Sequence, residues 1–472
     1  MTFSKIFSLI SFVLLSVCGF GEESSPKVVV IGAGLAGLTT AYRLQQKGID
    51  VHVYEARNRV GGRVLSAYAG GNIVELGGQN ITDGGKAENM RRLIDVFDLE
   101  LIERRADLAW GYFSEENLIS QSFLDQSASD PEQLKLELIE SAQKCKNMKE
   151  VFDDIFKDQD LLYKTLSTRL AGYEGGSIEK LSSFYVETLY YMLLGGLSAA
   201  HQDAEHHIDL LSIKGGNSLL AEKLAETLGK RVHLNMPLTA VSKDEKGLYH
   251  LAFENGEMTT AEILVLAIPC STYEEIVFDE TLFPEGRLEA IQNVQYGTNA
   301  KIIIPASLTS VPKPTCINDR AGCFLDSIHN SVILYYTKEA GRFSAETIQE
   351  TYDQERAMVE AGFKDLGLSQ LDPVFAQDAA WGSYEGPVGY SWPNDPYVKG
   401  SYSYIAAGQE EVFTAIEEQG EKEVKTLFAP IDHLYFAGEH ASILIDVAGT
   451  MEAAVESGER TARMIETALQ EG

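Results

Sequence analysis

The sequence has little cysteine and little positive charge. Its five cysteines in 472 residues match no metal-binding pattern and do not indicate a disulfide scaffold. Cys316 and Cys323 either pair in an oxidising compartment or stay separate. Lysine and arginine number 39 against 70 acidic residues, and the resulting net charge of −31 argues against nucleic-acid binding. Such a surface either serves solubility or weakly favours the approach of cationic substrates.

The first 25 residues contain one apolar run, from Ile6 to Val17, that is too short to span a bilayer comfortably. Lys5 precedes it and small and polar residues follow it, as in a secretory signal. The letters LLSVC end at Cys18 and resemble a bacterial lipoprotein box, although valine before the cysteine fits poorly. We expect a secreted, periplasmic or envelope-associated protein. Its membrane contact would be a lipid anchor at Cys18, with an uncleaved signal anchor as the alternative.

The remaining chain alternates between strand and helix patterns. Residues 27–34 form a β-branched run typical of a strand buried on both faces of a parallel sheet. A helical pattern up to Gly48 and a second strand at 50–56 complete a strand–helix–strand unit. We expect an α/β fold with a Rossmann-like dinucleotide-binding domain and a discontinuous α+β substrate domain. The first is assigned to residues 26–84, 208–290 and 396–472, and the second to residues 85–207 and 291–395.

The first strand ends in the pattern G-x-G-x-x-G, formed by Gly32, Gly34 and Gly37. These glycines permit a tight turn, a close approach of the backbone to a pyrophosphate, and close helix packing. Glu55 ends the second strand about twenty residues later, where a carboxylate accepts ribose hydroxyls. That carboxylate excludes a 2′-phosphate, so the cofactor is NAD or FAD.

The string EARNRVGGR at residues 55–63 decides between them, because NAD enzymes need no second glycine pair with arginines after the ribose-binding acid. Ordinary surface ion pairs would explain one of these arginines but not the whole string. The string resembles the signature of the flavin-containing amine oxidase superfamily. So do VELGGQNI at 74–81, the segments at 213–229 and 231–241, and the C-terminal YFAGEHAS and GTMEAAVESGERTA.

The resemblance implies that FAD is the cofactor and that the residues at the matching positions of this sequence contact it. Glu439 would accept hydrogen bonds from the ribityl chain, and the helix beginning near Gly449 would present its N–H groups to the pyrimidine edge of the ring. The other implied cofactor contacts are Ala56, Arg57, Gly62, Arg63, Gly77, Gly78, Val241, Gly438, Thr450 and Met451.

The resemblance also implies a catalytic wall. Lys301, inside an apolar strand where a lysine is costly to bury, would point at flavin N5 through a water. Tyr402 would form one side of an amine-guiding cage. The remaining substrate-pocket positions are Asn80, Trp392 and Thr450, of which Asn80 and Thr450 replace residues that are often aromatic in relatives. Ser401 stands where monoamine oxidases bond the flavin to cysteine, so we expect non-covalent FAD.

The implied reaction is oxidation of a small-molecule amine. A hydride would pass from the α-carbon to flavin N5, giving an imine, and O₂ would be reduced to H₂O₂. Polyamine and L-amino-acid oxidation remain alternatives, although no arginine near residues 77–92 is placed to hold a carboxylate. A flavin-binding envelope protein without turnover is the other alternative. Lys301 and Tyr402 argue against desaturases and porphyrinogen oxidases. The histidines at 201–207 are read as a solvated loop and not a metal site.

Overall fold

The computed structural model describes residues 27–81, 86–104, 110–114, 117–120, 131–193, 210–307, 315–419 and 422–471. The expected signal at residues 1–25, with Cys18, and the histidine run at 201–207 lie outside these ranges. No helix within the described ranges is long and apolar enough to cross a membrane. The same ranges contain no group of three or more histidine, cysteine or acidic side chains arranged to hold a metal ion.

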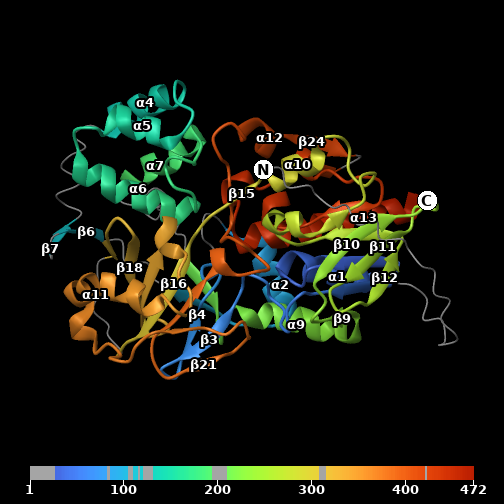
Figure 1. Ribbon diagram of the computed structural model, residues 1–472, viewed down its shortest axis with the longest axis horizontal. Helices are drawn as coiled ribbons and strands as arrows, with labels where there is room; N and C mark the ends of the chain where they lie inside the picture. The colour runs from blue at the N-terminus through green and yellow to red at the C-terminus, as the bar shows by residue number, and fades with distance from the viewer. Residues whose placement is uncertain are drawn as a thin grey trace, which may run out of the picture.

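A five-stranded parallel sheet forms one half of the molecule (Figure 1). Its strand order is β26-β13-β1-β2-β9, with β1 at Val28–Ile31, β2 at Val51–Tyr54, β9 at Val232–His233, β13 at Ile263–Leu266 and β26 at Leu434–Phe436. Every residue of β1 and β13 is buried, as expected for strands covered on both faces. The predicted strand–helix–strand unit is confirmed, because α1 (Leu35–Gln46) joins the parallel pair β1 and β2.

Helices cover this sheet. The C-terminal helix α13 (Met451–Glu471) lies against α1, and α9 (Ser218–Leu228) also packs on α1 (Figure 1). Thr40 of α1 donates its hydroxyl to the carbonyl of Gly458 at 3.2 Å, so the first and last helices are in direct contact. The last helix therefore packs on the first, and β26, the strand before α13, is separated from β1 by β13 alone.

A small mixed sheet, order β12-β11-β10-β14, adjoins these elements; β12, β11 and β10 are antiparallel, and β14 runs parallel to β10. It contains β10 (Leu238–Lys243), β11 (Tyr249–Phe253), β12 (Met258–Ala261) and β14 (Val277–Phe278). Shorter elements nearby are α2 (Glu88–Val96), β5 (Leu101–Arg104), β8 (Leu210–Ile213), α10 (Arg287–Gln292), α12 (Glu410–Thr414), β24 (Ile416–Gln419) and β25 (Lys422–Lys425).

An eight-stranded sheet of order β20-β22-β16-β19-β18-β17-β6-β7 forms the second half. Its strands are β6 (Trp110–Ser114), β7 (Asn117–Ser120), β16 (Ala300–Pro305), β17 (Thr315–Ile317), β18 (Ala321–Asp326), β19 (Ser331–Tyr336), β20 (Val374–Phe375) and β22 (Val388–Ser391). Helix α11 (Ile348–Phe363) packs against one face. Cys316 and Cys323 lie directly opposite each other in the β17–β18 ladder, both fully buried.

Two further groups complete the fold. The hairpin of β3 (Ser66–Ala69) and β4 (Asn72–Glu75) pairs with β21 (Ser383–Tyr384) and packs on the eight-stranded sheet. Helices α4 (Pro131–Ala142), α5 (Met148–Ile155), α6 (Asp160–Glu174) and α7 (Val186–Leu193) form a separate cap (Figure 1). The pair β15 (Gln295–Tyr296) and β23 (Ser403–Tyr404) links the halves.

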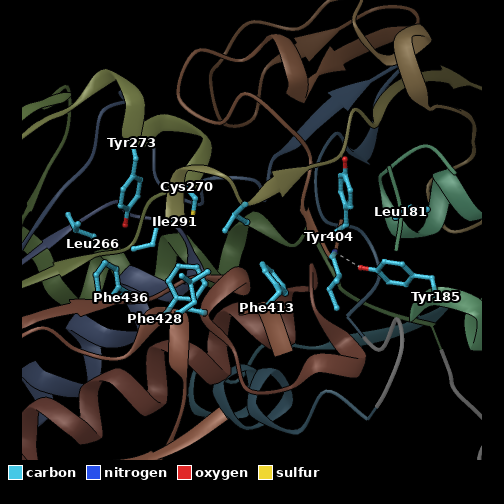
Figure 2. Packing of buried hydrophobic residues seen from close by; sticks show 14 of the residues in the cluster. Leu181, Tyr185, Leu266, Cys270, Tyr273, Ile291, Tyr404, Phe413, Phe428 and Phe436 are labelled. Atoms are coloured by element: carbon cyan, nitrogen blue, oxygen red, sulfur yellow. Dashed lines mark hydrogen bonds between the residues drawn. The ribbon is translucent and has the colours of Figure 1, made fainter. Parts of the chain in front are cut away.

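Aromatic side chains join the helical cap to the parallel-sheet half. Tyr185 of the cap accepts a hydrogen bond from the Ile405 amide at 2.8 Å, and its ring lies beside Tyr404 (Figure 2). Phe413 and Phe428 continue the same buried cluster toward Phe436 of β26 (Figure 2). This packing fixes the cap over the end of the parallel sheet where the polar residues gather.

Candidate active site

One cavity of about 1270 Å³ receives most of the residues singled out in the sequence. Its floor is formed where β1, β2, β13 and β26 end, at Gly32, Glu55, Ala267 and Gly438. Ligands of open parallel sheets bind at this carboxyl edge. The lining then extends past Lys301 to the helical cap. Seventeen of the predicted residues line it: Gly32, Gly34, Glu55, Ala56, Arg57, Gly62, Arg63, Gly77, Gly78, Asn80, Lys301, Trp392, Tyr402, Gly438, Glu439, Thr450 and Met451.

The glycine turn after β1 is shaped by close backbone approach. Gly32 has φ +102°, and a Cβ atom there would lie 2.5 Å from the carbonyl oxygen of Ala267. A Cβ atom on Gly37 would lie 2.1 Å from the oxygen of Gly32, so Gly37 serves helix packing and does not line the cavity. Gly34 precedes helix α1 and supplies no side-chain cap. The N–H groups of the first turn therefore suit an anion such as a phosphate.

Glu55 is held at the end of β2 by the backbone around it. Its two carboxylate oxygens accept from the amides of Ala33 (2.7 Å) and Arg57 (3.0 Å), and the residue is 4% exposed. The first of these bonds ties the acid to the glycine turn. A carboxylate fixed beside the anion site is the arrangement that a dinucleotide ribose requires.

The arginines that follow are buried and belong to an acidic network. Arg57 forms ion pairs with Asp395 and, at 2.8 Å, with Asp378. Arg59 reaches the other oxygen of Asp378 at 2.8 Å and the carbonyl of Gly62 at 2.9 Å. Asp378 lies between β20 and β22 of the eight-stranded sheet, and Asp395 follows β22. Surface ion pairing does not describe these arginines, which join the two halves of the molecule.

Arg63 and Glu439 meet at the end of β26. Arg63 Nη1 donates to Glu439 Oε1 at 2.7 Å and to the carbonyl of Ser401 at 2.8 Å. The Ser403 hydroxyl donates to Glu439 Oε2 at 2.6 Å. Burial alone would raise the pKa of Glu439, but the Arg63 guanidinium and the Ser403 hydrogen bond hold it below its usual range. The acid at the mouth of the core is therefore an ionised, paired carboxylate.

Two titratable groups lie directly behind this pair. Lys425 is 1% exposed, donates to the His440 carbonyl at 2.9 Å and places Nζ 3.9 Å from the centre of the Phe413 ring. Burial lowers the pKa of Lys425 to about 8 and that of His440 to about 4. His440 Nδ1 lies 3.2 Å from the Tyr296 hydroxyl, and its Nε2 has no hydrogen-bond partner among the described residues. The sequence analysis singled out neither Lys425 nor His440.

Lys301 extends from β16 to the cavity wall. Its Nζ donates to the carbonyls of Gly77 (2.8 Å) and Glu75 (2.9 Å) and to Gln79 Oε1 (3.1 Å). The side chain does not reach bulk water, since the residue is 6% exposed. These three oxygens supply the hydrogen-bond acceptors that water would otherwise provide. Burial raises the pKa of the neighbouring Glu75 to about 7, while the Asn217 amide hydrogen bond opposes this shift.

Tyr402 forms a rigid wall of the cavity. Its hydroxyl lies 2.8 Å from the Gly172 carbonyl and 2.9 Å from the Tyr173 carbonyl, and its ring packs on Gly175 and Gly449. Tyr402 belongs to the segment just before β23, but the hydrogen bonds to helix α6 of the cap fix the position of its ring.

The other expected pocket residues are also held by backbone contacts. Trp392 donates its indole N–H to the Leu76 carbonyl at 3.0 Å. The Thr450 hydroxyl donates to the Val447 carbonyl at 2.6 Å, and it accepts from the Ala453 amide at 3.2 Å. Thr450 therefore caps the start of α13, and Met451 packs on Gly78. Asn80 lines the cavity near Gly78.

Two regions of the lining differ from the sequence analysis. Val241 lies in β10, 2% exposed and outside the lining, in a strand whose two edges are paired with β11 and β14. Leu238 and Thr239 line the cavity at this end. Three charged residues of the cap that sequence reasoning missed also line it: Arg169, Glu174 and Glu187. Their segments match no motif, since only tertiary packing brings α6 and α7 over the sheet.

The residues present fit a flavin dinucleotide. The site has an anion-accepting helix start, a buried acid beside it, and a second ionised acid at the end of β26. The second acid and Lys301 lie far apart in the sequence but line one continuous cavity. A mononucleotide would leave one of the two acids without a ligand group to bind.

Comparison with known proteins agrees with this geometry. The family model for flavin-containing amine oxidoreductases matches residues 35–465. Polyamine oxidase 4 of Oryza sativa subsp. japonica is 24% identical over 92% of this chain and 87% of its own length. The L-amino-acid oxidase of Demansia vestigiata is 24% identical over 97% and 90%, respectively.

Solved structures show the same fold. Cyclohexylamine oxidase from Brevibacterium oxydans superposes with a TM-score of 0.72 at 17% identity, covering 95% of this chain and all of that one. Putrescine oxidase bound to putrescine gives a TM-score of 0.69 at 19% identity over 94% and 99%. The chain belongs to the flavin-containing amine oxidoreductase family and is a flavin-dependent amine oxidase, an oxidoreductase that acts on C–N donors.

Proposed function

We propose that the protein binds FAD without a covalent bond and oxidises a small-molecule amine with O₂. The observation that carries this proposal is the single cavity that joins the Gly32–Glu55 cradle, the Arg63–Glu439 pair and the Lys301–Tyr402 wall. When bound, FAD would accept a hydride at N5 from the α-carbon of a neutral amine, leaving an imine, with O₂ reduced to H₂O₂.

The chain's own residues orient and enclose the reactants. The start of α1 and Glu55 would hold the pyrophosphate and the adenosine ribose, and Glu439 would accept the ribityl hydroxyls. Gly77, Gly78 and the start of α13 would contact the ring. Lys301 would hold a proton at Nζ beside the flavin ring, and Tyr402 would present an immobilised aromatic face to the substrate. The cap of α6 and α7 excludes water from the reacting end of the cavity.

Ser401 supports non-covalent binding. Its hydroxyl donates to Asn299 Oδ1 at 2.9 Å, and the residue is 5% exposed beside Tyr402. A hydroxyl at this place cannot form the thioether that a cysteine forms. Acid precipitation should therefore release the yellow colour into the supernatant; colour that stays on the polypeptide contradicts this part of the proposal.

The cap supplies charges for more than one substrate class. Glu174 and Glu187 suit an amine with a second positive group, whereas Arg169 suits the carboxylate of an L-amino acid. The side chain of Arg169 donates to the Met192 carbonyl at 3.2 Å, which fixes it at the wall. Amines without a carboxylate are our first proposal, and an L-amino-acid substrate is the second because of Arg169.

One experiment tests these proposals together. The purified chain is loaded with FAD, its visible spectrum is recorded, and monoamines, diamines, polyamines and L-amino acids are added anaerobically. Bleaching by one group identifies the substrate class. Glu174→Gln should then raise KM for a diamine alone, and Arg169→Gln should raise KM for an amino acid alone. A protein that stays colourless after soaking in FAD contradicts the proposal, and a yellow protein that nothing bleaches supports binding without turnover.

We also propose that the N-terminal segment directs export, with a lipid anchor at Cys18. Expression in a bacterial host followed by detergent partitioning tests it. The full chain should enter the detergent phase and the Cys18→Ala chain should not; identical partitioning contradicts the anchor.

A further inference from the structure

A continuous set of buried polar side chains runs from Lys301 and Gln79 on the cavity wall to Asp326 and His329, which lie outside the lining. Lys301 Nζ donates to Gln79 Oε1 at 3.1 Å, and Gln79 Nε2 donates to Asp326 Oδ2 at 2.7 Å. His329 Nδ1 lies 2.9 Å from the same oxygen of Asp326. Each of the four residues is at most 7% exposed. The family motifs of the sequence contain neither Asp326 nor His329.

The surroundings of Lys301 favour its protonated form. An ammonium has three N–H donors, and three oxygens accept from Nζ, whereas a neutral amine has only two donors. Two of these oxygens are main-chain carbonyls, of Glu75 and Gly77, and cannot change direction. The third belongs to the Gln79 side chain. The Glu75 carboxyl, whose pKa burial raises to about 7, also interacts with the charge of Lys301 and favours the protonated lysine where it is ionised. Among the three acceptors, only the Gln79 amide can change the proton balance at Nζ by turning.

Asp326 determines that direction. A glutamine amide turned by 180° exchanges its oxygen and its NH₂ group. An ionised carboxylate only accepts hydrogen bonds, so the NH₂ group faces Asp326 and the oxygen faces Lys301. Asp326 is itself held in the turn between β18 and β19, where Oδ1 accepts from the amides of Ile328 (3.2 Å) and His329 (3.3 Å).

The main chain of Gln79 is fixed as well. Its carbonyl accepts from the Ser212 hydroxyl at 3.0 Å and from Asn217 Nδ2 at 2.9 Å. Because the backbone cannot move away, a change at Asp326 has to be taken up by the Gln79 amide group.

We infer that Gln79 and Asp326 are positioning residues for the proposed reaction. Asp326 directs the Gln79 oxygen at Lys301, and this holds a proton at Nζ on the cavity wall. The consequence for turnover rests on the proposed function, because Lys301 would stand beside the reacting ring. The geometry can be tested without turnover, so the two ideas can fail separately.

Chemical labelling of Lys301 provides the test, because acetic anhydride reacts with the neutral amine only. The purified full chain is labelled between pH 7 and 10 in the absence of amine, and the Lys301 peptide is measured by mass spectrometry. Asp326→Asn keeps the shape but donates where the carboxylate accepted, so the Gln79 amide turns over. The labelling rate of Lys301 at pH 8 should rise about tenfold, which corresponds to a pKa lower by about one unit.

A second substitution should reverse the first. Gln79→Glu in the Asp326→Asn chain supplies a carboxylate that accepts from both the new amide and Lys301. This double variant should label within about twofold of the wild type, as expected for directly coupled residues. The matched control is Asp372→Asn, at an exposed site, and exposed Lys144 serves as internal standard. Unchanged labelling in the Asp326→Asn chain, or a double variant as reactive as the single one, overturns the inference.

Gln79→Leu covers the case in which the Asp326→Asn chain does not fold. It removes the third acceptor and leaves the β18–β19 turn intact, so labelling must rise here too; unchanged labelling overturns the inference. In turnover, these variants should lower kcat and leave KM for the amine unchanged. A chain that shows the labelling pattern but is bleached by no amine refutes the proposed function and leaves the positioning role standing.

Discussion

Two lysines, Lys301 and Lys425, are buried among the described residues, and each is accommodated in a different way. Lys301 donates to three oxygens at the cavity wall. Lys425, behind the Arg63–Glu439 pair, has one carbonyl and the face of Phe413, and its pKa falls to about 8. A lysine is thus accommodated in the interior either by matched acceptors for its ammonium or by a lowered pKa that lets it lose its proton more readily. Removing the lysine of the first arrangement should therefore cost more stability than removing the lysine of the second.

The largest expected effect breaks the ion pair in front of Lys425. Arg63→Leu leaves Glu439 buried without its cation, which should cost about 3–5 kcal/mol in the free energy of unfolding. Urea denaturation of the full chain without FAD measures this. The control Lys144→Leu removes an exposed partner of Glu140 and should leave the midpoint unchanged. Equal midpoints for both variants would contradict the importance of the pair.

The pH dependence of stability tests His440 next. Its folded pKa of about 4 lies below the ordinary value, so the unfolded chain takes up a proton first as the pH falls. The contribution of neutral His440 to the free energy of unfolding is fully present above pH 6.5 and is lost as the pH falls through 4. The total loss is about 3 kcal/mol. His440→Gln should reduce the acid dependence of unfolding by this amount. If the free energy of unfolding changes equally with pH in the variant and the wild type between pH 7 and 4, His440 makes no such contribution.

Replacing each lysine by methionine sharpens the comparison directly. Lys301→Met leaves two carbonyls and the Gln79 amide without their donor, which should cost about 2–4 kcal/mol. Lys425→Met leaves one carbonyl and removes a buried charge, so the cost should be about 1 kcal/mol or less. Urea midpoints at pH 7 measure the difference, and equal costs would show that the number of acceptors is unimportant.

The smallest expected effect concerns the ring under Lys425. Phe413→Leu removes the aromatic face and should cost about 1 kcal/mol more than Phe156→Leu, a substitution at a buried ring over which no lysine or arginine of the described ranges lies. The excess should vanish in a Lys425→Met background. An excess that persists there would assign the effect to packing alone.

Much of the parallel-sheet half was readable from sequence because its signals are local. The β-branched run at 28–31, the glycine turn and the strand at 51–54 stand within thirty residues, and their order alone predicts a parallel pair. Glu439 was predicted at the end of a strand for the same reason. The local pattern also singled out Lys301, since a lysine in the apolar strand 300–305 demands an explanation.

The sequence by itself determined the glycine turn after β1, the acid at the end of β2 and the position of Lys301 in a strand, because the geometry of each follows from neighbouring residues and backbone rules. Only the tertiary structure decided the partners: Asp326 for Gln79, Asp395 for Arg57, Lys425 behind Glu439, and the charged cap residues Arg169, Glu174 and Glu187. Contacts between segments hundreds of residues apart depend on how helices and sheets pack, and the periodicity of side chains along the sequence does not predict that packing.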